Sequence, residues 1–235
     1  ELAELLERVR ASGYTDTFVI QDFIPGDDSG MRILTCYCDA AGRMRFAAFG
    51  HVLLEEHTPG ALGNPAGIIT QAGREVVEQA RRLLEHIGWR GYANFDLKYD
   101  PRDGRTVFFE LNPRLGRSNF YITAAGRNTT ELYVRERIQG LDPLPPGADE
   151  QLVTEHLYTV LPRPLLLRYV ADDALRARTR RLFRTGRATN PLWYAAERDP
   201  RRIAYLVAAQ LNQFRKYRRH YPPPPRRPAG PRVGG

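Results

Sequence analysis

The sequence predicts an α+β fold, in which strands pair as hairpins and helices pack against the resulting sheet. Three observations predict it. Segments with strand character occur in adjacent pairs joined by turn residues, one long segment carries apolar residues at helical spacing, and strand and helix do not alternate regularly along the chain. A chain of 235 residues, 42% of them hydrophobic, is long enough to bury the core that one or two such domains need.

Strand character is concentrated in the first half of the chain. Thr17–Ile24 is apolar and rich in β-branched residues, which predicts a buried strand. Met31–Asp39 and Arg43–Leu54 are joined at Ala40-Ala41-Gly42, which predicts two strands with a hairpin-like connection. The next segment, Glu55–Asn64, has too many Gly and Pro residues for regular structure and is predicted to be a loop.

Helical periodicity is clearest over Gln71–Ile87, where apolar residues recur three and four positions apart and Gly88 follows at the C-terminal side. The other elements that the patterns predict are helices over Leu2–Val9, Thr130–Gln139 and most of Ala196–Tyr217, a short strand within Val153–Val160, and a disordered or extended Pro- and Arg-rich tail over Tyr221–Gly235.

A second hairpin is predicted from Asn94 to Arg117, and it contains the residues with the clearest chemistry. Polar and apolar side chains alternate on both sides of Asp103-Gly104, a dipeptide typical of tight reversals. Antiparallel pairing around this turn places the side chains of one strand opposite those of the other. The predicted partners are Asp96 with Glu110 and Asn94 with Asn112.

Two carboxylates that face each other across a sheet repel, so the pairing of Asp96 with Glu110 needs a reason. A cation between them is the simplest one, and Mg²⁺ takes carboxylate and amide oxygens together with phosphate oxygens of a substrate. Arg114 and Arg117, a few residues further on, could hold more anionic oxygen. The hairpin therefore suggests a site for a metal and a nucleotide phosphate, although a lone acidic pair across a hairpin is more often a solvated surface feature.

Charge, cysteine content and hydropathy narrow the class of protein. The net charge of +8 comes almost entirely from arginine, which favours polyanionic partners, although a solvated arginine-rich surface is the simpler explanation. Cys36 and Cys38 lie two positions apart on one predicted strand and are expected to be reduced core thiols. The sequence has no apolar stretch long enough to span a membrane and no visible signal peptide, so we expect a cytoplasmic protein. Because the sequence begins inside a predicted helix, we also expect it to be a fragment.

Three segments match a pattern that is already known in other proteins. They are QDFIPGDDSGMR (Gln21–Arg32), GHVLLEEHTPGALGNPAGIIT (Gly50–Thr70), and the residues from Phe95 to Asn128 that contain FDLKYDPRDG and FFELNPRLGRSNFYITAAGRN. The third is specific, because a carboxylate, a turn and the motif E-x-N-x-R follow in order. Together the segments resemble the carboxylate–amine ligases of the ATP-grasp superfamily, and among these the D-aspartate ligases of peptidoglycan synthesis. The resemblance implies the C-terminal subdomain of the ATP-grasp fold, an antiparallel sheet with flanking helices, followed by a helical extension.

The resemblance also implies ATP and Mg²⁺ as cofactors. In its pattern Asp96, Glu110 and Asn112 hold the Mg²⁺ ions, and Arg114 contacts the acyl substrate or its phosphate. The implied reaction is ATP-dependent phosphorylation of a small-molecule carboxylate, with D-aspartate as one candidate. An amine then attacks the acyl phosphate, and the amine of a peptidoglycan precursor peptide is one candidate. Such phosphoryl transfer needs positioning and charge neutralisation rather than a nucleophilic side chain.

The nucleotide contacts that the resemblance implies lie near the start of the chain. Gln21, Phe23 and Ile24 match the hinge that lies against adenine, Asp28 matches an acid that binds ribose hydroxyls, and Arg32 resembles a basic residue near the phosphates or the carboxylate. The family usually has Glu where Gln21 stands, and Gln21 could equally be an amide satisfied in the core. The family's phosphate-binding lysines precede the hinge, and this sequence begins after them.

The implied domain boundaries follow the same pattern. Residues 1–20 are expected to be a remnant of the small lid subdomain, 21–145 the catalytic subdomain, 146–220 a mostly helical C-terminal extension and 221–235 a disordered tail. The N-terminal half of the fold is expected to be missing, and this chain alone is expected to be inactive as a ligase. The expected partners are small-molecule substrates and not nucleic acid, and a homo-oligomer stays open.

Two other functions also stay open. The basic C-terminal region could bind nucleic acid through phosphate contacts and stacking of Tyr205 and later aromatic residues, although the helical spacing of Phe214, Tyr217 and Tyr221 places these against a core. The chain could instead be a catalytically silent ATP-grasp remnant. Two further expectations are that Arg176, Arg178, Arg180, Arg181 and Arg184 lie on a solvated helix face and that Glu55, Glu56 and His57 lie in a loop near the substrate.

Overall fold

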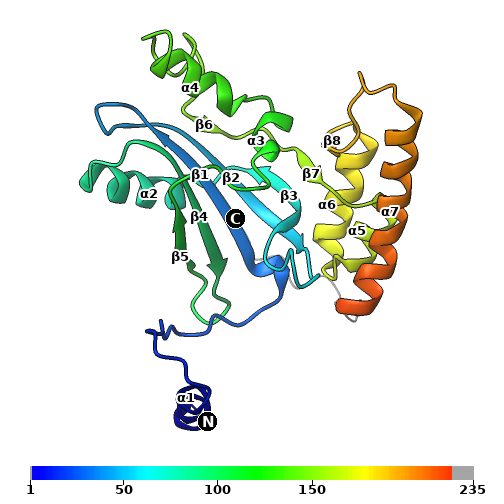
Figure 1. Ribbon diagram of the computed structural model, residues 1–235. Coiled ribbons are helices and arrows are strands. Elements are labelled where there is room, and N and C mark those ends of the chain that lie inside the picture. Colours follow the sequence, from blue (N-terminus) through cyan, green and yellow to red (C-terminus); the bar gives the residue numbers. More distant parts are fainter. Residues whose placement is uncertain (1, 224–235) are drawn as a thin grey trace.

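The computed structural model describes residues 2–223 and confirms the α+β prediction (Figure 1). Within these residues one mainly antiparallel sheet runs in the order β5-β4-β1-β2-β3-β7-β8, and β6 pairs with β2. The strands are β1 (Met31–Cys38), β2 (Met44–Glu55), β3 (Pro65–Gln71), β4 (Gly91–Tyr99), β5 (Thr106–Asn112), β6 (Gln151–Leu152), β7 (Leu157–Thr159) and β8 (Ala188–Thr189).

Helices cover both faces of the sheet and one of its ends. Over the described residues none of them is long and apolar enough to cross a membrane. The helices are α1 (Leu2–Ala11), α2 (Arg74–His86), α3 (Phe120–Ala124), α4 (Thr129–Arg137), α5 (Arg163–Tyr169), α6 (Asp173–Arg184) and α7 (Pro200–His220), and a 3-10 turn, η1 (Asp28–Gly30), precedes β1.

Strand β1 is the centre of the sheet, because it pairs antiparallel with β2 on one side and with β4 on the other. Side chains on a strand point alternately to the two faces. Ile33 and Tyr37 are buried with Tyr121 of α3, whereas Leu34 is buried with Leu84 of α2 in a second core. Each face of β1 therefore has its own apolar cover, which explains why nearly the whole strand is buried.

The C-terminal segment is attached to the same sheet. The short strand β7 pairs with β3, and β8 pairs with β7. A third core forms where Leu53 and Ile69 of the sheet meet α5, α6 and α7. These three helices stand together beside β3 and β7 (Figure 1). Residues 146–220 are thus mostly helical, as predicted, but they also contribute strands, and the domain boundary at residue 145 stays a prediction.

The prediction of a buried strand over Thr17–Ile24 is wrong. These residues form neither helix nor strand, and Val19 is 84% and Ile20 64% exposed. Helix α1 has no buried residue and stands apart from the sheet (Figure 1). A buried strand needs a partner edge and apolar cover, but both edges of β1 are already taken by β2 and β4, and no described segment covers these side chains.

The other expectations tested here are confirmed, with one exception on α6. The predictions of α2, α4, α7, β1, β2 and the hairpin of β4 and β5 are confirmed, and Cys36 and Cys38 are buried free thiols. Burial raises the pKa of Cys38 to about 12. The expectation of a fully solvated arginine face on α6 is wrong for Arg176, which is buried, donates to Val170 O (3.2 Å) and pairs with Asp173. The tail from residue 224 onward lies outside the described residues.

Gly50 gives a test of this packing. A Cβ atom at Gly50 would lie 2.6 Å from Ile68 Cγ2 and 3.0 Å from Ile33 Cγ2, both in the buried core. We expect Gly50→Ala to destabilise the protein by about 1–3 kcal/mol, as overpacking of a core does. Urea unfolding measures the change. Gly60→Ala is the matched control, since a Cβ there meets no atom within 4 Å, and equal stability of the two variants would contradict the described packing.

Candidate active site

The hairpin of β4 and β5 has the predicted register. Asp96 is directly opposite Glu110, and Asn94 is directly opposite Asn112. The reversal closes through a hydrogen bond from Asp100 N to Arg105 O (2.7 Å), with Gly104 in the left-handed region at φ 76°. A shift of register follows Asp96, so the strand is irregular beside the two carboxylates.

The amide of Asn112 lies between the two carboxylates. Its Nδ2 is 3.2 Å from Glu110 Oε1 and 3.4 Å from Asp96 Oδ2. Burial and the negative charge of Glu110 together raise the pKa of Asp96 to about 6, against the opposing effect of the Arg114 guanidinium. Arg114 is therefore close enough to act on the same charge, although its Nη1 donates to Leu115 O (3.2 Å).

This donor set suits a hard cation. Two carboxylates and an amide offer the oxygen ligands that Mg²⁺ prefers, and a cation would relieve the repulsion that raises the pKa of Asp96. Over residues 2–223 no cluster of three His, Cys, Asp or Glu side chains is suited to a metal ion. The third protein ligand in this region would therefore be the amide oxygen of Asn112, which requires the Asn112 side chain to present its oxygen in place of its nitrogen.

A buried polar network fixes the strand that carries Asp96. Asn94 is buried and accepts a hydrogen bond from Thr35 Oγ1 on β1 (2.9 Å). The hydroxyl of Tyr121 on α3 is 3.1 Å from Thr35 Oγ1 and donates to Ala48 O (2.9 Å). Asn94 and Asp96 lie on the same face of β4, so this network holds the position of the carboxylate two residues away.

The predicted adenine segment lies beside the turn of this hairpin. Gln21 and Ile24 line a hollow with Asp100 and Arg102, and Arg102 Nη2 is 3.0 Å from Asp22 Oδ2. Gln21 is exposed, so the alternative of a satisfied core amide is wrong. Phe23 is 77% exposed.

Lys98 connects the segment predicted to contact adenine to β4, the strand that carries Asp96. Its Nζ is 5.3 Å from the centre of the Phe23 ring and 3.2 Å from Gly26 O. Lys98 is two residues from Asp96 on the same face of β4. The strand that carries the carboxylate therefore also holds a cation against the segment that was predicted to contact adenine.

Asp28 ties η1 to the end of β2. Its Oδ2 accepts hydrogen bonds from Glu55 N (2.8 Å) and from His57 Nε2 (2.7 Å). Burial, followed by the charges of Asp28 and Asp96, raises the pKa of Glu55 to about 7, although Lys98 opposes the shift. Glu55 is thus a further carboxylate at this site. Sequence reasoning placed it in a loop, and its position directly after the apolar run of β2 was the signal that it ends a strand.

Arg32 lies next to the hairpin, but on the opposite face from its two carboxylates. It pairs with Leu97, the neighbour of Asp96, so its side chain leaves the sheet on the opposite face. Its Nη1 donates to Ser29 O and Met31 O (both 2.8 Å), and burial lowers its pKa to about 10. This placement gives no support to the predicted contact with phosphate or carboxylate.

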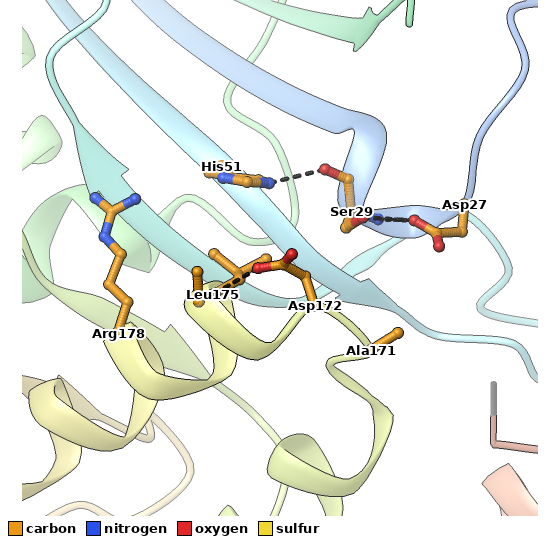
Figure 2. Close-up of a pocket in the computed structure, with 8 residues that line it drawn as sticks. Asp27, Ser29, His51, Ala171, Asp172, Leu175 and Arg178 are labelled. Carbon is orange, nitrogen blue, oxygen red and sulfur yellow. Dashed lines mark hydrogen bonds between the residues drawn. The ribbon is translucent and has the colours of Figure 1, made fainter. Parts of the chain in front are cut away.

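A separate pocket of about 450 Å³ lies near Arg32, between η1, β2 and α6. Figure 2 shows His51 directed at Ser29, whose carbonyl oxygen is 2.8 Å from His51 Nε2, with Asp172 and Arg178 on the facing helix. Burial and the charges of Arg32 and Arg178 together lower the pKa of His51 to about 3, so the imidazole is neutral. Arg178 is itself held by Glu155 Oε1 (2.5 Å) and Gln71 Oε1 (3.0 Å). The charged groups on α6 are therefore mostly satisfied within the protein.

The amino-acid sequence is similar to one protein-family model and to one curated protein. The model of the carbamoyl-phosphate synthase L chain ATP-binding domain matches residues 60–126. D-aspartate ligase of Enterococcus faecium (strain Aus0004) is 32% identical over 217 residues, which are 91% of this chain and 52% of that protein. The chain therefore spans about half the length of this curated relative.

Solved structures with partial similarity have lower identities. N5-carboxyaminoimidazole synthetase from Staphylococcus aureus, complexed with ADP, has a TM-score of 0.43 at 14% identity and covers 58% of this chain and 35% of its own. L-amino acid ligase from Bacillus licheniformis has a TM-score of 0.35 at 18% identity and covers 48% of this chain and 30% of its own.

The resemblance to this family rests on the sequence matches. They include both the Gly/Pro-rich loop after β2 and the hairpin of β4 and β5. The family model covers the hairpin from its first residue to its last, and the match to D-aspartate ligase extends through most of the C-terminal helices. These matches confirm the resemblance of the chain to the ATP-grasp superfamily, and within it to D-aspartate ligase.

Proposed function

We propose that this chain supplies the ATP- and metal-binding part of a ligase that joins a carboxylate to an amine. The observation that carries the proposal is the meeting of Asp96, Glu110 and Asn112 on one hairpin, with Arg114 close enough to lower the pKa of Asp96. In the proposed reaction a carboxylate oxygen attacks the γ-phosphorus of ATP, which gives an acyl phosphate and ADP. The amine nitrogen then attacks the acyl carbon, and phosphate and a proton leave.

The residues of the hairpin have distinct proposed roles. Asp96, Glu110 and Asn112 would hold Mg²⁺, which neutralises charge on the phosphate oxygens when it is bound. Arg114 would bind two oxygens of the acyl phosphate or carboxylate, since a guanidinium offers parallel donors. Lys98 adds positive charge next to the carboxylates, on the side of the adenine segment.

The nucleotide is proposed to lie between the hairpin and the segment before η1. Gln21, Phe23 and Ile24 would contact adenine, and the exposed ring of Phe23 is available for stacking on it. Asp28 would bind ribose hydroxyls through the carboxylate oxygen that does not accept from Glu55 and His57.

The substrate class rests on similarity to D-aspartate ligase. D-aspartate is the proposed carboxylate, and the amine of a peptidoglycan precursor peptide is the proposed acceptor. ADP release by the full-length protein across a panel of amino acids and amines tests this choice. We expect release only when Mg²⁺, D-aspartate and an acceptor amine are all present. Release with another pair would change the substrate, and no release with any pair would refute the ligase function.

Substitution of the metal ligands gives a sharper prediction. Glu110→Gln and Asn112→Ala should each lower Mg²⁺-dependent ADP release by about 100-fold or more, because each removes a ligand of the Mg²⁺ ion that would neutralise phosphate charge. Glu131→Gln, an exposed carboxylate in the first turn of α4, is the matched control and should keep full activity. Far-UV circular dichroism checks that the fold is retained. Turnover that survives both ligand changes would show that the metal assignment is wrong.

The raised pKa of Asp96 predicts how stability depends on pH. The folded pKa of about 6 lies above the ordinary 3.8, so the charged form destabilises the folded state above pH 6 in the absence of metal. Asp96→Asn should therefore raise Tm by about 2–4 °C at pH 8 without Mg²⁺. The gain should disappear as the pH falls from 6 to 4, where the carboxyl group is protonated.

Thermal unfolding at pH 4, 6 and 8 measures this gain. Asp103→Asn is the control, since Arg105 lowers the pKa of Asp103 and removal of that charge has no stabilising effect at high pH. A gain at Asp96 that is the same at pH 4 and pH 8 would contradict the electrostatic explanation.

A further inference from the structure

The C-terminal end of α7 reaches the nucleotide side of the proposed site. Helix α7 runs beside α5 and α6, outside the sheet (Figure 1). Its last turns nevertheless contact the end of β2, because the hydroxyl of Tyr217 donates to Glu55 O (2.6 Å). These two residues are 162 positions apart in the sequence. The helical extension therefore touches the strand end whose backbone N–H is bonded to Asp28.

A chain of aromatic contacts continues from this point to Asp28. The ring of Tyr221 stacks on His57, with centroids 3.6 Å apart and planes inclined by 3°. Tyr169 lies behind both tyrosines, with its ring 5.0 Å from Tyr217 and 5.9 Å from Tyr221. Stacking against a flat ring restricts the rotation of His57, so its Nε2 stays directed at Asp28.

Asp28 has little freedom of its own. Its side chain is 13% exposed and that of His57 is 15% exposed, so their hydrogen bond is partly shielded from water. Both described bonds to the carboxylate, from Glu55 N and His57 Nε2, end on the same oxygen, Oδ2. The imidazole and the Glu55 N–H together therefore orient the plane of the carboxylate, and so determine where its second oxygen points.

We propose that His57 is a positioning residue for ATP, and that His57 is held in place by Tyr217 in the last turns of α7 and by Tyr221 directly after the helix. It turns the Asp28 carboxylate so that the second oxygen meets the ribose hydroxyls. This inference rests on the proposed function, because it needs a nucleotide at Asp28. In this proposal the C-terminal helical extension contributes to nucleotide binding, although it lies outside the segment that carries the metal ligands.

Mg²⁺–ATP dissociation constants of the full-length protein test the inference. His57→Ala should weaken binding about 10-fold, and His57→Gln, which keeps a side-chain N–H donor, should restore most of it. Asp28→Asn should also weaken binding. If His57 acts through Asp28, the double variant should bind no more than about 3-fold more weakly than Asp28→Asn alone. A merely structural role for His57 would give losses that multiply, and that result would overturn the inference.

The role of the stack is tested with a second pair of variants. Tyr221→Phe keeps the ring and should bind Mg²⁺–ATP like the parent protein, whereas Tyr221→Ala should resemble His57→Ala. Tyr205→Ala, at a residue on α7 that is 71% exposed, is the control and should have no effect. Equal binding by Tyr221→Ala and the parent would refute the role of the helix. Failure of the parent protein to bind Mg²⁺–ATP at all would refute the proposed function itself, so the two failures are distinct.

Discussion

The register between the central strands is the constraint on which the candidate site depends. On β4, Phe95 and Leu97 are buried in the core under α2, so Asn94 and Asp96 must face the other way. A slip of one residue would exchange these faces and place the amide of Asn94 and the carboxylate of Asp96 in an apolar core. The bond from Thr35 to Asn94 opposes such a slip, because it joins β1 to β4 by side chains in addition to the backbone ladder. Fold and site are thus specified by the same alternation of residues.

The two faces of the sheet divide the charged groups into separate sets. Asp96, Glu110 and Lys98 lie on the face of the hairpin that the adenine segment approaches, whereas Arg32 and His51 lie on the opposite face. The first set has a repulsive pair and a raised pKa at Asp96, and so retains electrostatic energy that a cation can relieve. The basic groups of the second set are bonded mostly to backbone carbonyls and side chains of the protein itself. The face that carries Asp96, Glu110 and Lys98 is therefore the better candidate for the functional site.

The sequence was sufficient for features that depend on local pattern and insufficient for those that depend on distant partners. The facing of Asp96 and Glu110 could be predicted, because period-two alternation and one turn determine it. The side of the sheet on which Arg32 lies requires knowledge of its partner strand. Thr17–Ile24 has the composition of a buried strand, but composition cannot show that no sheet edge is available to it. The contact of α7 with Glu55 could not be predicted from pattern, since it joins residues far apart in the chain.

The position of Lys98 has a practical consequence. The sequence contains two lysines, and the other one, Lys216, is on α7. Reagents that acylate amines usually modify many lysines on a protein surface. The overall rate of reaction then does not report on any single site. Here half of the lysine amines lie at the candidate nucleotide site, within reach of Phe23 and Gly26. The rate at which Lys98 is acylated would therefore act as a reporter of occupancy.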